Sequence, residues 1–231
     1  MDDPGGPIRH PARAPLTLSD LFVYPDLIEV NDRIDQRLYK SSVFLTNAES
    51  LKGGVVLEGD EKSGRTSLLR RLFCEYYDRN FYPILLNGSQ LYRATEQSVA
   101  QALTSAIEEQ YGPGRREEFM QLSRAKRIVL IDDLDDSRVK SSAARAELIR
   151  LLKAQFDYVL ISIEQPLGLT SQRPSPDDPL ITFSRFRIQP FGYLLRNKLV
   201  AKWHSLGADG ALDEPTLLAR RDASERIIDS V

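Results

Sequence analysis

The feature that most constrains the fold of this chain is a series of five short, mostly apolar segments separated by helical patterns. Continuous rather than alternating hydrophobicity is typical of strands in a parallel sheet that is covered on both faces. The five predicted strands are Gly54–Glu58, Tyr82–Leu86, Arg127–Ile131, Tyr158–Ile163 and Phe186–Gln189. Between them, apolar residues recur at the three- and four-residue spacing of helices. This alternation predicts an α/β fold with three layers.

The composition agrees with a globular protein and narrows its possible partners. Residues of the AVILMFWYC group make up 42% of the 231 residues, which is enough to bury a core and excludes disorder throughout the chain. Lysine and arginine number 31 against 33 acidic residues, for a net charge of -2. Dedicated nucleic-acid binders are usually basic, so nucleic acid is not expected as a partner. The single cysteine, Cys74, excludes a disulfide framework and a cysteine-based zinc site.

Targeting and membrane signals are not found in the sequence. No apolar run approaches the roughly 18 residues that a transmembrane helix needs. The start of the chain, Met1–Pro7, lacks the basic residues and the apolar stretch of a signal peptide. We therefore expect a cytoplasmic protein that does not associate with membranes.

A glycine-rich segment directly after the first predicted strand carries the clearest chemical signal. Gly59–Ser67 reads GDEKSGRTS, which follows the P-loop pattern G-x-x-x-x-G-K-[ST] except that Arg65 replaces the lysine. Glycines at positions 59 and 64 allow the backbone N–H groups to approach phosphate oxygens closely. The start of the following helix adds the positive end of its dipole. We expect Gly59, Lys62, Ser63, Gly64, Arg65, Thr66 and Ser67 to contact a nucleotide, with the Thr66 hydroxyl also on Mg²⁺.

Arg65 is the main departure from this pattern. An arginine is always charged and can hold phosphate through two hydrogen bonds, but it is longer than lysine and planar. The substitution therefore places hydrolysis in question more than binding. A glycine-rich turn without any ligand is the structural alternative.

A second motif, which is acidic, follows the third predicted strand, with one strand between it and the P-loop. The run Ile128–Ile131 is apolar and ends in Asp132 and Asp133, the arrangement of a Walker B strand. In a P-loop protein the first acid orients the Mg²⁺ shell, and the second polarises the attacking water. We expect Asp132 to help hold the metal ion and Asp133 to be the catalytic residue. Acids also end many ordinary strands, so the motif depends on the P-loop that precedes it.

The sequence resembles the STAND class of signal-transduction P-loop ATPases, which are relatives of NACHT and AAA-type modules. The resemblance spans about residues 16–206. It rests on the segments GDEKSGRTSLLRRLF, RIVLIDDLDD, YVLISIE and FRIQPFGYLLRNKLVAKW. It implies a five-stranded parallel sheet in the order 5-1-4-3-2 with ATP at the carboxyl edge of the strands. It also implies that the segment Phe22–Leu27, and Pro25 within it, lines the adenine side.

Three further polar residues lie on the predicted fourth and fifth strands. The fourth predicted strand ends in Ser162–Gln165, where some STAND subfamilies have an arginine that senses the γ-phosphate. Ser162 is either a polar sensor or a buried strand serine. Arg185 and Arg187 flank the fifth strand. For these two we favour surface positions over phosphate sensing, since loop arginines are mostly exposed.

The domain organisation follows from composition. Residues 1–15, with four prolines, are predicted to form a flexible tail, and 16–206 the P-loop NTPase domain. Residues 207–231 have room for one helix, starting near Pro215, so we expect only an incomplete lid.

These features favour an ATP- and Mg²⁺-binding signal-transduction switch with slow or absent hydrolysis, whose partners are other protein domains or further copies of itself. Two alternatives stay open. One is a catalytically inactive P-loop scaffold for protein–protein interaction, which Arg65 suggests. The other is an AAA-type ATPase acting on DNA, for which we find no basic stripe or winged-helix segment in the sequence.

Overall fold

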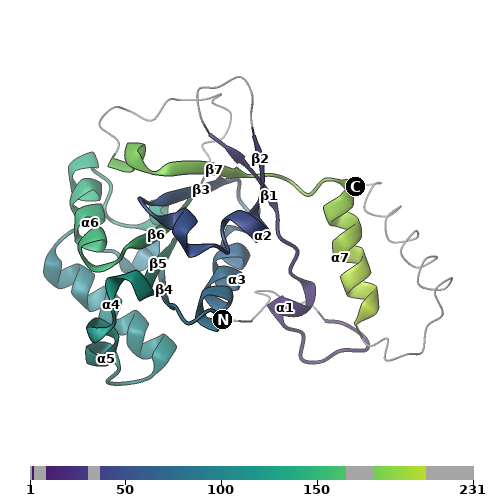
Figure 1. Ribbon diagram of the computed structural model, residues 1–231, viewed down its shortest axis with the longest axis horizontal. Coiled ribbons are helices and arrows are strands. Elements are labelled where there is room, and N and C mark those ends of the chain that lie inside the picture. The colour runs from purple at the N-terminus through teal and green to yellow at the C-terminus, as the bar shows by residue number, and fades with distance from the viewer. Residues whose placement is uncertain (1, 3–8, 31–36, 165–178, 207–231) are drawn as a thin grey trace.

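The computed structural model describes residues 2, 9–30, 37–164 and 179–206 (Figure 1). Its strands are β1 (Asp26–Glu29), β2 (Leu38–Lys40), β3 (Val55–Gly59), β4 (Tyr82–Asn87), β5 (Arg127–Asp132), β6 (Tyr158–Glu164) and β7 (Ser184–Ile188). Its α-helices are α1 (Leu18–Leu21), α2 (Ser41–Phe44), α3 (Arg65–Asp78), α4 (Glu96–Tyr111), α5 (Arg116–Gln121), α6 (Ser142–Gln155) and α7 (Tyr193–Ser205). Short 3-10 turns lie at Ala48–Leu51, Gly88–Gln90, Arg124–Lys126, Leu134–Asp136 and Pro179–Thr182.

The strands form one mixed sheet of seven strands in the order β2-β1-β7-β3-β6-β5-β4. The five predicted strands are β3 to β7, and they are parallel neighbours in the order 5-1-4-3-2. The prediction of a five-stranded, wholly parallel sheet was nevertheless wrong in size and in overall order. Two short strands that precede the P-loop, β1 and β2, extend the sheet, with β1 antiparallel to both β7 and β2.

Helices cover the parallel part of the sheet on both faces, which confirms the three-layer α/β prediction. All six residues of β5 are buried, and its four apolar residues alternate between two cores. Ile128 and Leu130 pack on the α3 side, together with Leu68, Leu72 and Tyr76. Val129 and Ile131 pack on the opposite side, with α4 and α6. A strand with apolar neighbours on both faces needs no polar alternation, and this explains the continuous apolar runs.

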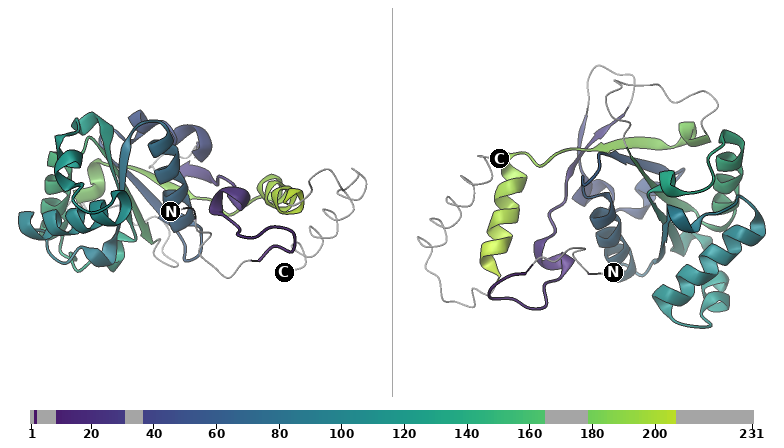
Figure 2. Two further views of the ribbon diagram at one scale, coloured as in Figure 1. Left: turned by 90° about the horizontal axis from the view of Figure 1, so that it is seen from below. Right: turned by 180° about the vertical axis from the view of Figure 1, so that it is seen from behind.

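Helix α7 lies at the opposite end of the molecule from α4, α5 and α6, with α1 between α7 and α3 (Figures 1 and 2). Trp203 on α7 is half-buried, and its ring lies 4.6 Å from that of His10. The predicted boundaries at 15 and 206 stay predictions, because residues 207–231 and most of 1–8 lie outside the described residues. Within the part of the chain that the structure describes, no helix has the length and apolar character needed to cross a membrane.

Arg185 and Arg187 on β7 are not the surface residues that we expected. Both form ion pairs with the buried Glu58 of β3, at 3.0 Å for Arg185 and 3.4 Å for Arg187. The register places Glu58 directly beside Arg187, with Arg185 two residues before it on the same face. The Glu58 carboxylate, on the strand that leads into the P-loop, thus pairs with two guanidinium groups of β7.

We predict that Glu58→Gln destabilises the fold by about 3 kcal/mol, because it leaves two largely buried cations without their carboxylate. Urea unfolding followed by circular dichroism measures the effect. Glu147→Gln is the matched control, since it breaks the exposed Glu147–Arg150 pair on α6 and should leave the midpoint unchanged. Equal midpoints for the two variants would show that the Glu58 cluster contributes nothing to stability.

Candidate nucleotide-binding site

The P-loop segment connects the buried strand β3 to α3, as the sequence predicts. Its turn depends on two left-handed residues, Lys62 with φ 64° and Gly64 with φ 88°. The Ser63 N–H donates to the Asp60 carbonyl at 3.1 Å and tightens the loop. The first N–H groups of α3 have no acceptor within the helix. Such a concave set of backbone donors at a helix start is suited to phosphate.

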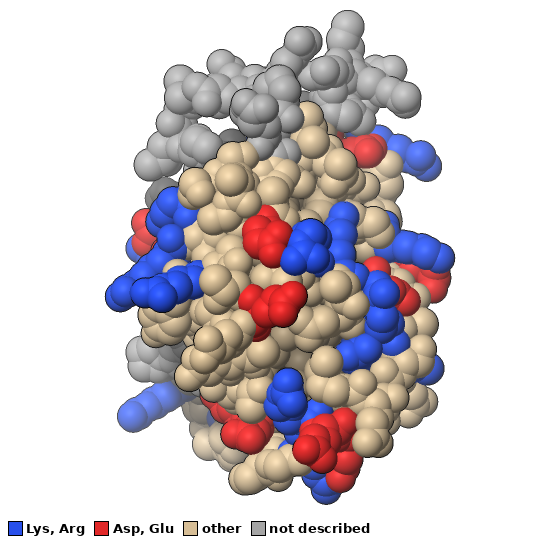
Figure 3. Space-filling model, turned by 90° about the vertical axis from the view of Figure 1, so that its left-hand side faces the viewer, with Lys and Arg blue, Asp and Glu red and all other residues tan. Residues whose placement is uncertain are grey.

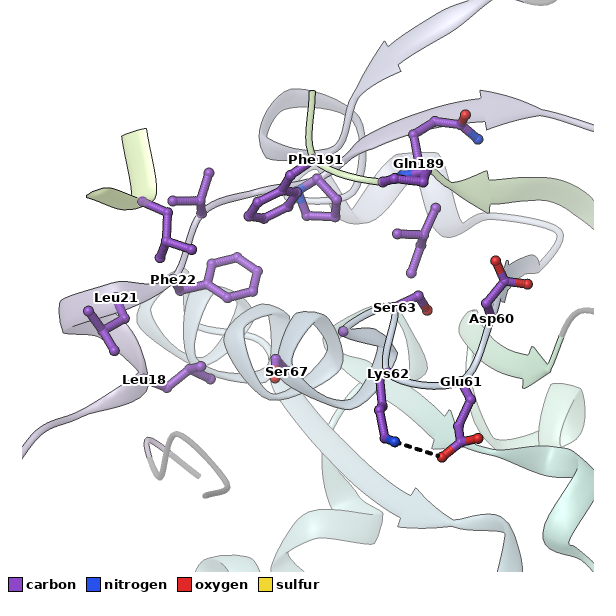
Figure 4. Close-up of a pocket in the computed structure, with 16 residues that line it drawn as sticks. Leu18, Leu21, Phe22, Asp60, Glu61, Lys62, Ser63, Ser67, Gln189 and Phe191 are labelled. Carbon is purple, nitrogen blue, oxygen red and sulfur yellow. Dashed lines mark ion pairs between the residues drawn. The ribbon is translucent and has the colours of Figure 1, made fainter. Parts of the chain in front are cut away.

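The charged side chains of the loop lie outside this concavity. Asp60, Glu61 and Lys62 are exposed, and the Lys62 ammonium lies 3.6 Å from the Glu61 carboxylate. Figure 4 shows both of these side chains directed away from the pocket. The structure does not aim the Lys62 ammonium at the place where phosphate would lie, and its contact with nucleotide stays a prediction.

A cavity of about 520 Å³ opens on one side of the P-loop. The rings of Phe22 and Phe191 face into it, with Ser63 and Ser67 opposite them (Figure 4). Phe22, Val23 and Pro25 all line it, so the structure places the predicted adenine segment beside the loop. The remaining lining residues are Leu18, Leu21, Asp60, Glu61, Lys62, Gly64, Ile188, Gln189, Pro190 and Leu199. The volume and the apolar walls are suited to a flat organic ring.

A second cavity, of about 430 Å³, lies on the other side of the start of α3. It brings together Thr66, Asp132 and Asp133, the predicted metal and catalytic residues. Asn87, which pairs in register with Asp132, and Gln90 also line it, and sequence reasoning missed both. Asn87 ends a strand beside the acidic strand, and that position was a usable signal.

These residues fit a magnesium ion that is held mainly by phosphate oxygens. Among the described residues, no three His, Cys, Asp or Glu side chains form a metal-binding cluster. Mg²⁺ commonly takes one or two protein oxygens and completes its shell with phosphates and water. The Thr66 hydroxyl and the Asp132 carboxylate would supply two such oxygens.

Arg65 joins the beginning of the P-loop to the end of β5. Its Nη1 donates to the Gly59 carbonyl, and its Nη2 lies 2.9 Å from Oδ1 of Asp133. Its Nε donates to the same oxygen at 3.1 Å. The side chain is only 10% exposed, so little water screens this ion pair. The cation at the lysine position of the motif is thus already paired with the predicted catalytic carboxylate.

Ser162 on β6 connects the two acids. Its hydroxyl donates to Oδ1 of Asp132 and accepts from the Asp133 N–H, both at 2.9 Å. The serine is fully buried, so these two bonds fix where the Asp132 carboxylate points. Of the two roles left open by the sequence, a buried strand serine and a polar sensor, the geometry is compatible with both.

Burial raises the pKa of Asp133 above its ordinary value, and the neighbouring Asp132 raises it further, while Arg65 opposes both effects. A carboxylate with a raised pKa binds a proton more readily, which suits a group that polarises water. Its pairing with Arg65 works against that role in this arrangement.

Gly88 determines where Asp133 lies. Asp133 has a φ of 49°, in the left-handed region. A β-carbon at Gly88 would lie 1.9 Å from the Asp133 carbonyl oxygen, so only glycine allows the turn after β4 to pack against it. Sequence reasoning missed Gly88, because Asn87–Gln90 resembles any polar turn.

The comparisons with known proteins give no family for this chain. No protein-family model matches the sequence, and no curated protein matches it. Solved structures that are similar at low identity include a DnaA, a RuvB and a Cdc6p. For AMPPCP-bound DnaA from Aquifex aeolicus the TM-score is 0.43 at 15% identity, covering 80% of this chain and 57% of that one. For the RuvB Holliday junction branch migration motor of Thermotoga maritima the TM-score is 0.43 at 15% identity, covering 71% of this chain and 47% of that one.

For Cdc6p from Pyrobaculum aerophilum the TM-score is 0.48 at 16% identity, covering 82% of this chain and 57% of that one. The chain therefore spans about half the length of these proteins. At TM-scores below 0.5 the similarity does not decide function.

We predict that Gly88→Ala destabilises the protein by about 2 kcal/mol, because the new methyl group must push Asp133 out of its turn. Thermal unfolding measures the loss. Gly192→Ala is the control, since a β-carbon there meets no atom within 4 Å. If Gly88→Ala unfolds at the same temperature as the parent protein, the contact with Asp133 is not a constraint.

Proposed function

We propose that this chain is an ATP- and Mg²⁺-binding P-loop module with slow hydrolysis. The observation that carries the proposal is the position of Gly59–Ser67 between two cavities. One has aromatic and apolar walls, and the other holds Thr66, Asp132 and Asp133. A base and ribose need the first environment, and phosphates with a metal ion need the second.

In this proposal the chain's own groups divide the work. The backbone N–H groups of Gly59–Ser67 bind the phosphates, and the hydroxyls of Ser63 and Ser67 line the path toward the ribose. Thr66 and Asp132 hold the metal ion. Phe22, Pro25 and Phe191 contact the base.

Slow hydrolysis follows from the pairing of Arg65 with Asp133. Polarising water requires a carboxylate oxygen that is free to accept a proton. Here Oδ1 of Asp133 accepts a hydrogen bond from Nε of Arg65 and lies 2.9 Å from its Nη2. The ion pair occupies Oδ1, and it must open before the guanidinium can reach a terminal phosphate.

The findings do not support signal transduction of the STAND or NACHT type over an AAA-type architecture. The site geometry is compatible with either architecture. An AAA-type ATPase acting on DNA is therefore kept as the second candidate. On the face formed by α4, α5 and α6, however, basic and acidic side chains alternate, and no broad basic area is visible there (Figure 3).

Gly64→Val should weaken Mg·ATP binding more than about tenfold, because a β-branched residue at φ 88° costs more than 1 kcal/mol and reshapes the loop. Isothermal titration calorimetry with ATP, ADP and GTP is the measurement. Gly114→Val is the matched control, with φ 74° but in the loop between α4 and α5, and should bind like the parent.

Two results would contradict this proposal. Unchanged affinity in folded Gly64→Val would place the phosphates elsewhere. A folded parent chain that gives no heat with millimolar Mg·ATP would favour the inactive scaffold instead.

Arg65→Lys should raise ATP turnover about tenfold or more while changing the ATP dissociation constant less than about threefold, since one ammonium cannot bridge Gly59 and Asp133 as a guanidinium does. Steady-state phosphate release measures turnover. Arg116→Lys, an exposed site on α5, is the control and should change neither quantity. Adding Asp133→Asn to Arg65→Lys should remove the gain. Equal turnover in the parent and in Arg65→Lys would exclude the ion pair as the cause of slow hydrolysis.

A further inference from the structure

A third cavity, of about 580 Å³, lies behind the segment Phe22–Pro25, on the side away from the P-loop. We call it the α7 cavity, because α7 forms one wall of it through Leu195, Lys198, Ala201, Lys202 and Ser205. The rest of the wall comes from Ser19, the segment Phe22–Asp26, the segment Lys40–Ser42 and Arg71 of α3. Its volume suits a small organic molecule. Nothing in the proposed nucleotide chemistry uses it.

Cations outnumber acids in the wall of the α7 cavity. Lys40, Arg71, Lys198 and Lys202 line it, against a single carboxylate, Asp26. Asp26 is already paired with Lys40 at 3.5 Å. Arg71 is paired with Glu75, an acid of α3 that does not line the cavity.

The two lysines of α7 are the cations of this wall that could pair with a bound anion. Among the described residues, neither Lys198 nor Lys202 forms an ion pair with a carboxylate, and the Lys202 ammonium donates to the Ser19 carbonyl at 3.3 Å. Burial lowers the pKa of Lys202, and Arg71 lowers it further, while Asp20 opposes them. An anion bound beside Lys202 would offset the repulsion between Lys202 and Arg71.

The rest of the wall is apolar or carries hydroxyl groups. Phe22, Val23, Pro25 and Leu195 provide apolar surface next to the lysines. A ligand that fills this space therefore combines an apolar body with one anionic group, either a phosphate or a carboxylate.

The α7 cavity and the P-loop cavity share a wall. Phe22, Val23 and Pro25 line both of them. Helix α7 also faces both, with Leu199 on the P-loop side and Lys198 and Lys202 on the other. The rings of Phe22 and Tyr24 touch at 4.9 Å, and the Tyr24 hydroxyl is held by Glu75. A molecule in one cavity thus presses on residues that contact a molecule in the other.

We propose that the α7 cavity is an effector site that binds a small organic anion and thereby changes the affinity of the P-loop cavity for nucleotide. The coupling rests on the proposed nucleotide function, whereas the anion site does not. Coupling between two sites is reciprocal, so nucleotide would change anion affinity by the same factor.

Trp203, the single tryptophan of the chain, lies next to Lys202 and reports on α7. The experiment titrates the full chain with phenyl phosphate, benzoate and the neutral benzyl alcohol and follows tryptophan fluorescence. We expect a saturable change with phenyl phosphate or benzoate and none with benzyl alcohol. The tighter of the two anions identifies phosphate or carboxylate as the preferred group. No saturable change with either anion overturns the proposal.

Variants test whether the anion binds in the α7 cavity or at the P-loop. Lys198→Gln combined with Lys202→Gln should raise the anion dissociation constant about tenfold or more, which corresponds to about 1.4 kcal/mol. Lys52→Gln combined with Lys126→Gln, two exposed lysines elsewhere, is the matched control and should bind like the parent. Gly64→Val should also keep the fluorescence response. Parent-like binding by the α7 double variant would overturn the proposal.

The coupling has its own readout. The affinity for a fluorescent ADP analogue should change about fivefold when phenyl phosphate is saturating, and the α7 double variant should abolish that change. An unchanged ADP affinity overturns the coupling. If ADP does not bind at all, the proposed function fails, and the fluorescence titration still decides whether the anion site exists.

Discussion

Parallel pairing of β3, β6 and β5 brings the candidate site together, because parallel strands end at one edge of the sheet. The P-loop follows β3, the two acids end β5, and Ser162 lies near the end of β6 between them. These segments are about 30 to 100 residues apart in the chain, yet hydrogen bonds join them directly. The burial of both sheet faces fixes the register, and the register fixes which polar atoms meet.

Arg65 distinguishes this edge of the sheet from a P-loop site that has a lysine at the same position. A lysine in the same place would present one ammonium group to phosphate. The guanidinium is long and flat enough to contact the Gly59 carbonyl and the Asp133 carboxylate together. The cation at this position is therefore neutralised within the protein. Under the proposed function, a nucleotide would compete with the Asp133 carboxylate for Arg65.

The sequence was informative where a signal is local. The P-loop and the acids at 132 and 133 follow continuous apolar runs, and the structure places them at the ends of β3 and β5, with β6 between these strands. Strands β1 and β2 were missed because they have four and three residues and lie where the sheet is only partly buried. Arg185, Arg187 and Gly88 were misjudged or missed for another reason. Their partners, Glu58 and Asp133, are distant in the chain, and a single sequence carries no record of which strands become neighbours.

The place of β3 in the sheet has a consequence for how the chain reaches its native state. Val55 of this early strand pairs with Leu160 on one side and with Ser184 on the other, both more than 100 residues later. The strand that carries the P-loop thus has neither neighbour until most of the chain has left the ribosome. Contacts of such long range form slowly, and until they do both edges of an apolar strand are open to pairing with other chains. Chaperone protection during synthesis would therefore matter most for this segment.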